Sequence, residues 1–171
     1  KYAGVPVWNG LTDVDHPTQI LADLLTIEEH VAKPLNKVKV VFSGDIRNNM
    51  SYAWMYGCAK MGMHYVAYGP AELADQLDQE VIAKVQEVAK ETGAVIEVSS
   101  DPESLKGADV IYADVWASMG QEGESEKRRA VFEGKYQIND AVMAVAKSDA
   151  MVQHCLPAHR GEEITDSVMD N

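Results

Sequence analysis

VKVVFSGDIRNN, residues 38–49, joins an apolar run to a polar turn and a helix start. It opens with the mostly apolar run Val38–Phe42, which indicates a strand covered on both faces. A glycine and an aspartate follow, and then two asparagines, which are good residues for capping the start of a helix. A buried strand, a polar turn and a helix in this order predict one unit of an α/β domain with parallel strands.

The same alternation continues along the chain in both directions. Further apolar runs predict strands at His64–Ala67, Val95–Val98, Val110–Ala113 and Met151–Gln153, with weaker candidates at Val5–Trp8 and Tyr136–Ile138. Apolar residues at helical spacing predict helices at Thr18–Glu28, Met50–Met61, Gln79–Thr92, Asn139–Lys147 and Glu162–Met169. We therefore expect an α/β fold of the Rossmann-like kind, an open three-layer sandwich with a mainly parallel sheet and helices on both faces.

The composition narrows the class of partner and the cellular setting. The 171 residues carry 27 acidic and 15 basic side chains, a formal charge of −12, which argues against binding to nucleic acid. No apolar run approaches the roughly 18 residues of a membrane span, so no membrane partner is expected. Cys58 and Cys155 are the two cysteines, too few for a disulfide scaffold, which favours a reducing, cytoplasmic location.

Polar segments follow four of the predicted strands. They are NGLTDVDHPTQ, SGDIRNN, DVWASMG and HCLPAHR, which begin at residues 9, 43, 114 and 154. Ligands of open α/β sheets bind beyond the carboxyl ends of the strands. We therefore expect these segments to meet at one site.

Each segment has a functional and a structural interpretation. In HPTQ, the backbone donors after Pro17 make an anion site, or Pro17 simply starts a helix beside a solvated His16. In GDIRNN, one asparagine caps the helix, which leaves the other to bind a ligand. Asp114 is well placed to receive an amine, or it orders its loop. Cys155 is an inert small side chain, or a thiol whose pKa is lowered by its neighbours.

Two further features of the sequence bear on the site. The polar stretch Gly120–Arg129 is expected to be a mobile surface loop that runs into a helix, and it either stays solvated or closes over the site. The histidines and cysteines lack the spacing of a metal site, so neither a metal nor a cofactor is expected.

Together, HPTQILADLLT, GDIRNN, DVWASMG and HCLPAHRGEEIT resemble the aspartate/ornithine carbamoyltransferase family, and SMG and HCLP point to ornithine as the amino acid. The resemblance implies that His16 and Gln19 contact carbamoyl phosphate, with Cys155 and Leu156 beside the carbamoyl group. It also implies that Asn49, Asp114, Ser118 and Met119 hold L-ornithine. Asp114 and Cys155, the latter as a thiolate, would serve catalysis by positioning the amine that attacks the carbonyl carbon.

The resemblance also implies how the chain is organised. Family members carry a Ser-Thr-Arg-Thr phosphate-binding motif that is not found in this sequence. We therefore expect residues 1–171 to be the ornithine-binding domain, without the N-terminal carbamoyl-phosphate domain, and the isolated chain to be inactive. The parent enzyme is expected to be a homotrimer or a multiple of trimers.

Three other functions are alternatives to this one. They are a related carbamoyltransferase with another acceptor such as putrescine, a non-catalytic amino-acid-binding module, and a nucleotide-binding Rossmann domain. The last is disfavoured because no strand is followed by a Gly-rich turn.

Overall fold

The computed structural model describes residues 3–117, 123 and 125–171 and contains one five-stranded sheet. The strands are β1 (Lys39–Ser43), β2 (His64–Tyr68), β3 (Val95–Ser99), β4 (Val110–Ala113) and β5 (Met151–His154). Their order is β3-β2-β1-β4-β5, and every neighbouring pair is parallel. The five stronger strand predictions are confirmed, each to within about one residue at either end.

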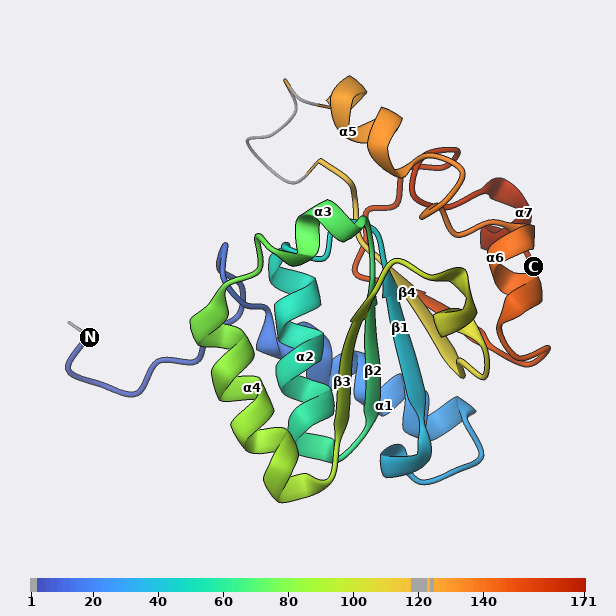
Figure 1. Ribbon diagram of the computed structural model, residues 1–171. Helices are drawn as coiled ribbons and strands as arrows, with labels where there is room; N and C mark the ends of the chain where they lie inside the picture. The colour runs from blue at the N-terminus through green and yellow to red at the C-terminus, as the bar shows by residue number, and fades with distance from the viewer. Residues whose placement is uncertain (1–2, 118–122, 124) are drawn as a thin grey trace.

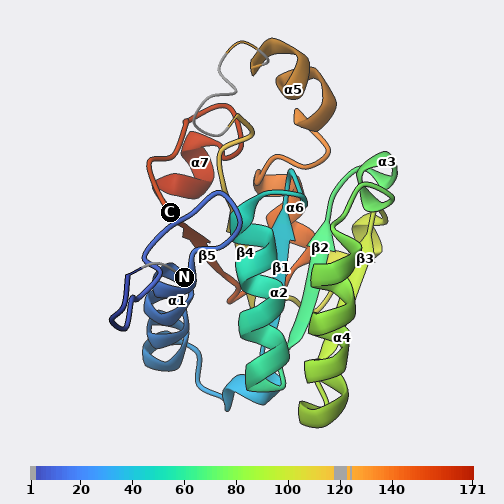
Figure 2. The same cartoon turned by 90° about the vertical axis from the view of Figure 1, so that its left-hand side faces the viewer.

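Helices cover both faces of this sheet. They are α1 (Pro17–His30), α2 (Asn49–Met61), α3 (Ala71–Ala74), α4 (Gln79–Thr92), α5 (Ser125–Phe132), α6 (Asp140–Val145) and α7 (Asp166–Met169), with 3-10 turns η1 (Leu35–Lys37) and η2 (Pro102–Leu105). Figures 1 and 2 show α1, α2 and α4 on one face and α6 on the other, where η2 packs against α6. The predicted three-layer α/β fold is confirmed.

The centre of the sheet is buried on both sides, as the continuous apolar runs predict. All four residues of β4 and the last four of β1 are buried. Across this layer Trp54 of α2 packs edge-on against Tyr112 of β4, with the ring centres 5.2 Å apart. Burial at the centre fixes β1 and β4 as neighbours, and this pair positions the loops that follow them.

The two weaker strand predictions are wrong. Val5–Trp8 forms no strand, and Trp8 is 91% exposed, because this run has no neighbour in the sheet. Within Tyr136–Ile138, Ile138 makes an isolated bridge to Ile164. The same bridge shortens the last helix, which begins at Asp166 rather than Glu162.

Within Gly120–Arg129, the part from Ser125 onward is helical and continues to Phe132. Residues 118–122 and 124 lie outside the described residues. None of the described helices is both long and apolar enough to cross a membrane.

Candidate active site

A cavity lies where the strand order reverses between β1 and β4. Such reversals open a crevice at the carboxyl ends of the strands, where ligands of α/β sheets bind. The cavity has a volume of about 430 Å³. Its lining includes five of the predicted site residues, His16, Asn49, Asp114, Cys155 and Leu156, together with His159.

The loop after β1 is held close to the loop after β4. Gly44 has a φ of +135°, and a side-chain Cβ there would lie 3.6 Å from the Trp116 ring. Asn48 then caps α2, since its side-chain oxygen accepts a hydrogen bond from the Ser51 N–H at 2.8 Å. The same side chain donates through Nδ2 to Asp114 Oδ2 at 3.0 Å. One asparagine therefore both starts the helix and orients the carboxylate.

Asp114 is the polar centre of the cavity, and it is 8% exposed. Its Oδ1 accepts hydrogen bonds from the Cys155 thiol at 3.1 Å and from the Val115 N–H at 2.8 Å, while Oδ2 accepts from Asn48. An ionised carboxylate has about four acceptor positions. Among the described residues three are used, so Oδ2 keeps one position for a ligand amine.

The thiol of Cys155 has a raised pKa, whereas a lowered pKa and a thiolate were expected. Burial raises the pKa of the thiol, and the adjacent Asp114 carboxylate raises it further, so the side chain stays protonated and donates to Asp114. Arg160 does not counter this effect, because its guanidinium pairs with Asp166 and Asp170. In the unliganded chain the sulfur is therefore a neutral donor rather than the expected thiolate.

The remaining predicted residues lie around this centre in different ways. Asn49 lines the cavity, and its Nδ2 donates to the Thr12 carbonyl at 2.9 Å. Gln19 does not line the cavity, since its Nε2 donates to Asp23 Oδ1 at 3.0 Å. His16 stands at the N-cap of α1 without a side-chain cap bond. Ser118 and Met119, which were predicted to hold the amino acid, lie outside the described residues.

The sequence did not reveal a second polar contact between the two loops. Arg128 Nη1 donates to Asp45 Oδ2 at 2.6 Å and to the Trp116 carbonyl at 3.1 Å. Burial acts to raise the pKa of Asp45, but hydrogen bonds from Arg47 and Arg128 hold it below its usual range. This buried carboxylate therefore ties the segment before α2 to the segment that carries Asp114.

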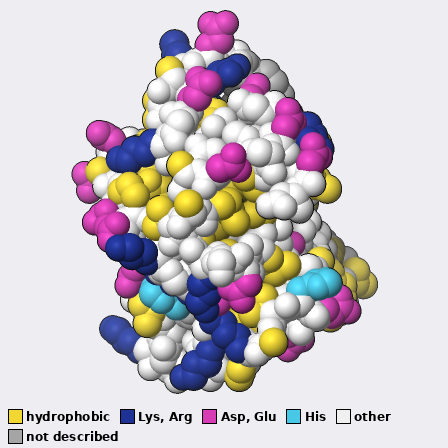
Figure 3. Space-filling view, turned by 90° about the vertical axis from the view of Figure 1, so that its right-hand side faces the viewer, with side chains coloured by type: hydrophobic (Ala, Val, Ile, Leu, Met, Phe, Trp, Pro, Cys, Tyr) yellow, Lys and Arg dark blue, Asp and Glu magenta, His cyan; other side chains and the backbone are white. Residues whose placement is uncertain are grey.

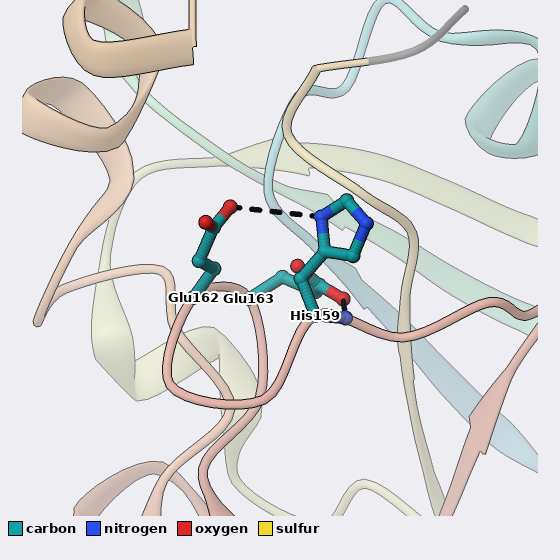
Figure 4. Close-up of side chains that lie close together, drawn as sticks. All are labelled: His159, Glu162 and Glu163. Atoms are coloured by element: carbon teal, nitrogen blue, oxygen red, sulfur yellow. Dashed lines mark hydrogen bonds and ion pairs between the residues drawn. The ribbon is translucent and has the colours of Figure 1, made fainter.

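Three potential metal ligands lie beside the cavity, in the loop that follows β5. Atoms of His159, Glu162 and Glu163 lie within 4.8 Å of one another (Figure 4). Glu163 Oε1 already accepts two hydrogen bonds, from the His154 ring and the His159 N–H, and His159 is exposed. We assign no metal to this group, and the absence of a metal stays a prediction.

A second cavity, of about 540 Å³, lies along β5 between α6 and α7. Figure 3 shows the face of the molecule on this side, where hydrophobic side chains gather between charged ones. The lining of this second cavity includes Met143, Met151, Val152, Val168 and Met169. It lacks the convergence of loops from β1, β4 and β5 that marks the first cavity.

Comparison with known families matches residues 36–171 to "Aspartate/ornithine carbamoyltransferase, Asp/Orn binding domain". Residues 1–29, which include His16 and Gln19, match the carbamoyl-P binding domain of the same family. The two matches meet between α1 and β1, close to η1.

Individual relatives agree with this match. The catabolic ornithine carbamoyltransferase of Clostridium perfringens is 53% identical over 99% of this chain and 52% of its own length. The structure of ornithine carbamoyltransferase from Pyrococcus furiosus has a TM-score of 0.88 at 47% identity, over 99% of this chain and 53% of that chain. The anabolic enzyme of Campylobacter jejuni has a TM-score of 0.91 at 36% identity, over 99% of this chain and 55% of that chain.

The chain spans about half the length of the curated relatives it matches. The likeness runs through every segment that lines the first cavity, because it covers 99% of the chain. The chain belongs to the aspartate/ornithine carbamoyltransferase family.

Proposed function

We propose that this chain supplies the ornithine side of an enzyme that transfers the carbamoyl group of carbamoyl phosphate to the δ-amine of L-ornithine. The products are citrulline and phosphate. The observation that carries the proposal is Asp114, a buried carboxylate that keeps one acceptor position in a cavity at the switch point of the sheet. The names of the relatives support ornithine as the amino acid.

The carbamoyl transfer requires a group that orients the amine. An alkylamine such as that of ornithine has a pKa near 10.4 and is protonated at neutral pH, so it must lose a proton before it attacks. Asp114 receives the ammonium, which gives up one proton to solvent, and holds the resulting amine beside the carbonyl carbon. The bond from nitrogen to that carbon forms as the bond from the carbon to the phosphate oxygen breaks, and a second proton of the nitrogen passes to the departing phosphate. Cys155 acts as a neutral S–H that fixes the Asp114 carboxylate. Orientation supplies most of the rate, since phosphate is a fair leaving group.

Of the other predicted residues, some contact ornithine and the rest contact carbamoyl phosphate in this proposal. Asn49 holds the backbone end of ornithine, together with Ser118 and Met119. Leu156 lies beside the carbamoyl group, and His16 donates to the oxyanion that develops there. Gln19, turned toward Asp23 in the unliganded chain, contacts carbamoyl phosphate after a side-chain rotation.

The wider context is part of the same proposal. Residues 36–171 supply the ornithine-binding domain, and the segment with His16 and Gln19 belongs to the part that matches the carbamoyl-P binding domain. The reaction needs neither metal nor cofactor, the enzyme works in the cytoplasm, and it assembles as a trimer or a multiple of trimers. The chain by itself forms no citrulline, because it holds only one side of the site.

The proposal is tested on the chain itself by recording amide NMR spectra during titration with L-ornithine and with putrescine. The Val115 amide reports on the site, since it donates to Asp114 Oδ1. We expect weak ornithine binding that shifts this signal, is lost in Asp114→Asn, and exceeds the effect of putrescine. Equal shifts with putrescine would favour another acceptor, and tight binding of ornithine alone would favour a non-catalytic binding module.

A further inference from the structure

The turn that carries Cys155 is fastened to a buried carboxylate outside the cavity lining. Glu163 is 0% exposed, and its Oε1 accepts hydrogen bonds from His154 Nε2 at 3.1 Å and from the His159 N–H at 2.6 Å. Figure 4 shows this carboxylate at the backbone of His159, while Glu162 reaches the ring of the same histidine. One side chain therefore holds both ends of residues 154–159.

The contact continues from the carboxylate into the middle of the turn. His154 Nδ1 accepts a hydrogen bond from the Leu156 N–H at 2.9 Å. An imidazole that accepts at Nδ1 carries its proton on Nε2, and that proton is donated to Glu163. Hydrogen bonds from His154 and His159 keep the pKa of Glu163 below its usual range although burial acts to raise it. The carboxylate is therefore ionised and selects this tautomer.

The backbone of the turn needs such support. Leu156 has a φ of +58°, a left-handed conformation that is unfavourable for a residue with a Cβ. A free turn would relax from this conformation, and Cys155 would then leave the Asp114 carboxylate, 3.1 Å away. The bonds from His154 and His159 to Glu163 oppose that relaxation.

We infer that Glu163 is a positioning residue, which acts through His154 and the His159 N–H to hold Cys155 on Asp114 and Leu156 at the cavity wall. Its meaning for catalysis rests on the proposed function, whereas the positioning itself rests on the contacts alone. Glu162 is the matched control, because it is the same residue type in the same loop and, among the described residues, its side chain pairs with the ring of the exposed His159, at 3.7 Å.

The test measures alkylation of the Cys155 thiol by iodoacetamide in the 171-residue chain, followed by mass spectrometry. Cys58 is buried, so Cys155 is the thiol labelled in the folded state. We expect Glu163→Gln to label about tenfold faster or more, since the freed thiol leaves the carboxylate that raises its pKa. Glu162→Gln and the remote helix-cap variant Asp78→Ala should label at the wild-type rate.

A folded Glu163→Gln variant that labels at the wild-type rate would overturn the inference, and so would equal acceleration in Asp78→Ala. If Glu163→Gln does not fold, hydrogen exchange of the Leu156 amide in the wild-type chain decides the question. Protection comparable to that of the central strands supports the positioning role of Glu163, and exchange at the rate of a free loop refutes it. Neither measurement uses a substrate, so the result is independent of whether citrulline is formed.

Discussion

Gly57→Ala tests how closely α1 must approach α2 to bring the HPTQ segment to the site. A Cβ at Gly57 would lie 2.5 Å from Cγ2 of the buried Ile20, which follows Gln19 on α1. Carbon atoms in contact prefer about 3.5–4.0 Å, so the helices would have to separate by roughly 1 Å. Alanine favours the helix over glycine by about 1 kcal/mol, and overpacking costs about 1–3 kcal/mol. Because β-branched Ile20 is stiff, we expect a net loss of about 1–2 kcal/mol.

Urea unfolding followed by circular dichroism measures this loss in Gly57→Ala, Ile20→Ala and the double variant. Ile20→Ala removes the methyl group that the new Cβ meets, so Gly57→Ala should be neutral or stabilising in that background. In thermal unfolding each 1 kcal/mol corresponds to about 2–4 °C for a chain of this size. A single Gly57→Ala variant that is as stable as the wild type, or more so, would show that α1 and α2 tolerate the added methyl group without separating.

Three further predictions follow from polar side-chain contacts. Asp109 is buried and forms salt bridges with Lys33 and Lys147. Burial acts to raise the pKa of Asp109, but these contacts lower it overall. Its stabilisation is therefore present above the unfolded carboxyl pKa and lost as pH falls through the folded value. Asp109→Asn should cost about 1–2 kcal/mol in urea unfolding at neutral pH, and a cost that persists in acid would contradict this. Asp114→Asn should speed alkylation of Cys155, because it removes the charge that raises the thiol pKa; an unchanged rate would count against that contact. Asp78→Ala should lower the unfolding free energy by about 1 kcal/mol through loss of the α4 cap, measured by urea unfolding.

The layers of the fold could be predicted because burial leaves a strong trace in the sequence. Val110–Ala113 reads as one apolar run, and it is a strand buried at every position. Val5–Trp8 reads the same way over a few residues, yet it is exposed. Local pattern does not say whether a run finds a neighbour in the sheet, and this is why the weaker strand predictions failed.

The site could be predicted as a set of segments, but not as a set of contacts. Two adjacent asparagines indicate that one caps the helix and the other is spare. Only the geometry shows that Asn48 does both: it caps α2 and also donates a hydrogen bond to Asp114. The pair between Asp45 and Arg128 joins positions 83 residues apart, and no local pattern indicates it. Sequence proximity of Arg160 to Cys155 does not indicate the thiol pKa, because the fold turns the guanidinium toward Asp166 and Asp170.

Citrulline formation in a chimera shows whether the cavity at Asp114 receives the amine of ornithine during carbamoyl transfer. Residues 1–171 would replace the matching half of the Clostridium perfringens relative, to which they are 53% identical. We predict citrulline from carbamoyl phosphate and L-ornithine, with little transfer to putrescine, and a loss of about 100-fold in kcat/KM in Asp114→Asn from one charged hydrogen bond. A folded chimera that prefers putrescine, or whose Asp114→Asn variant keeps full activity with ornithine, would contradict the claim.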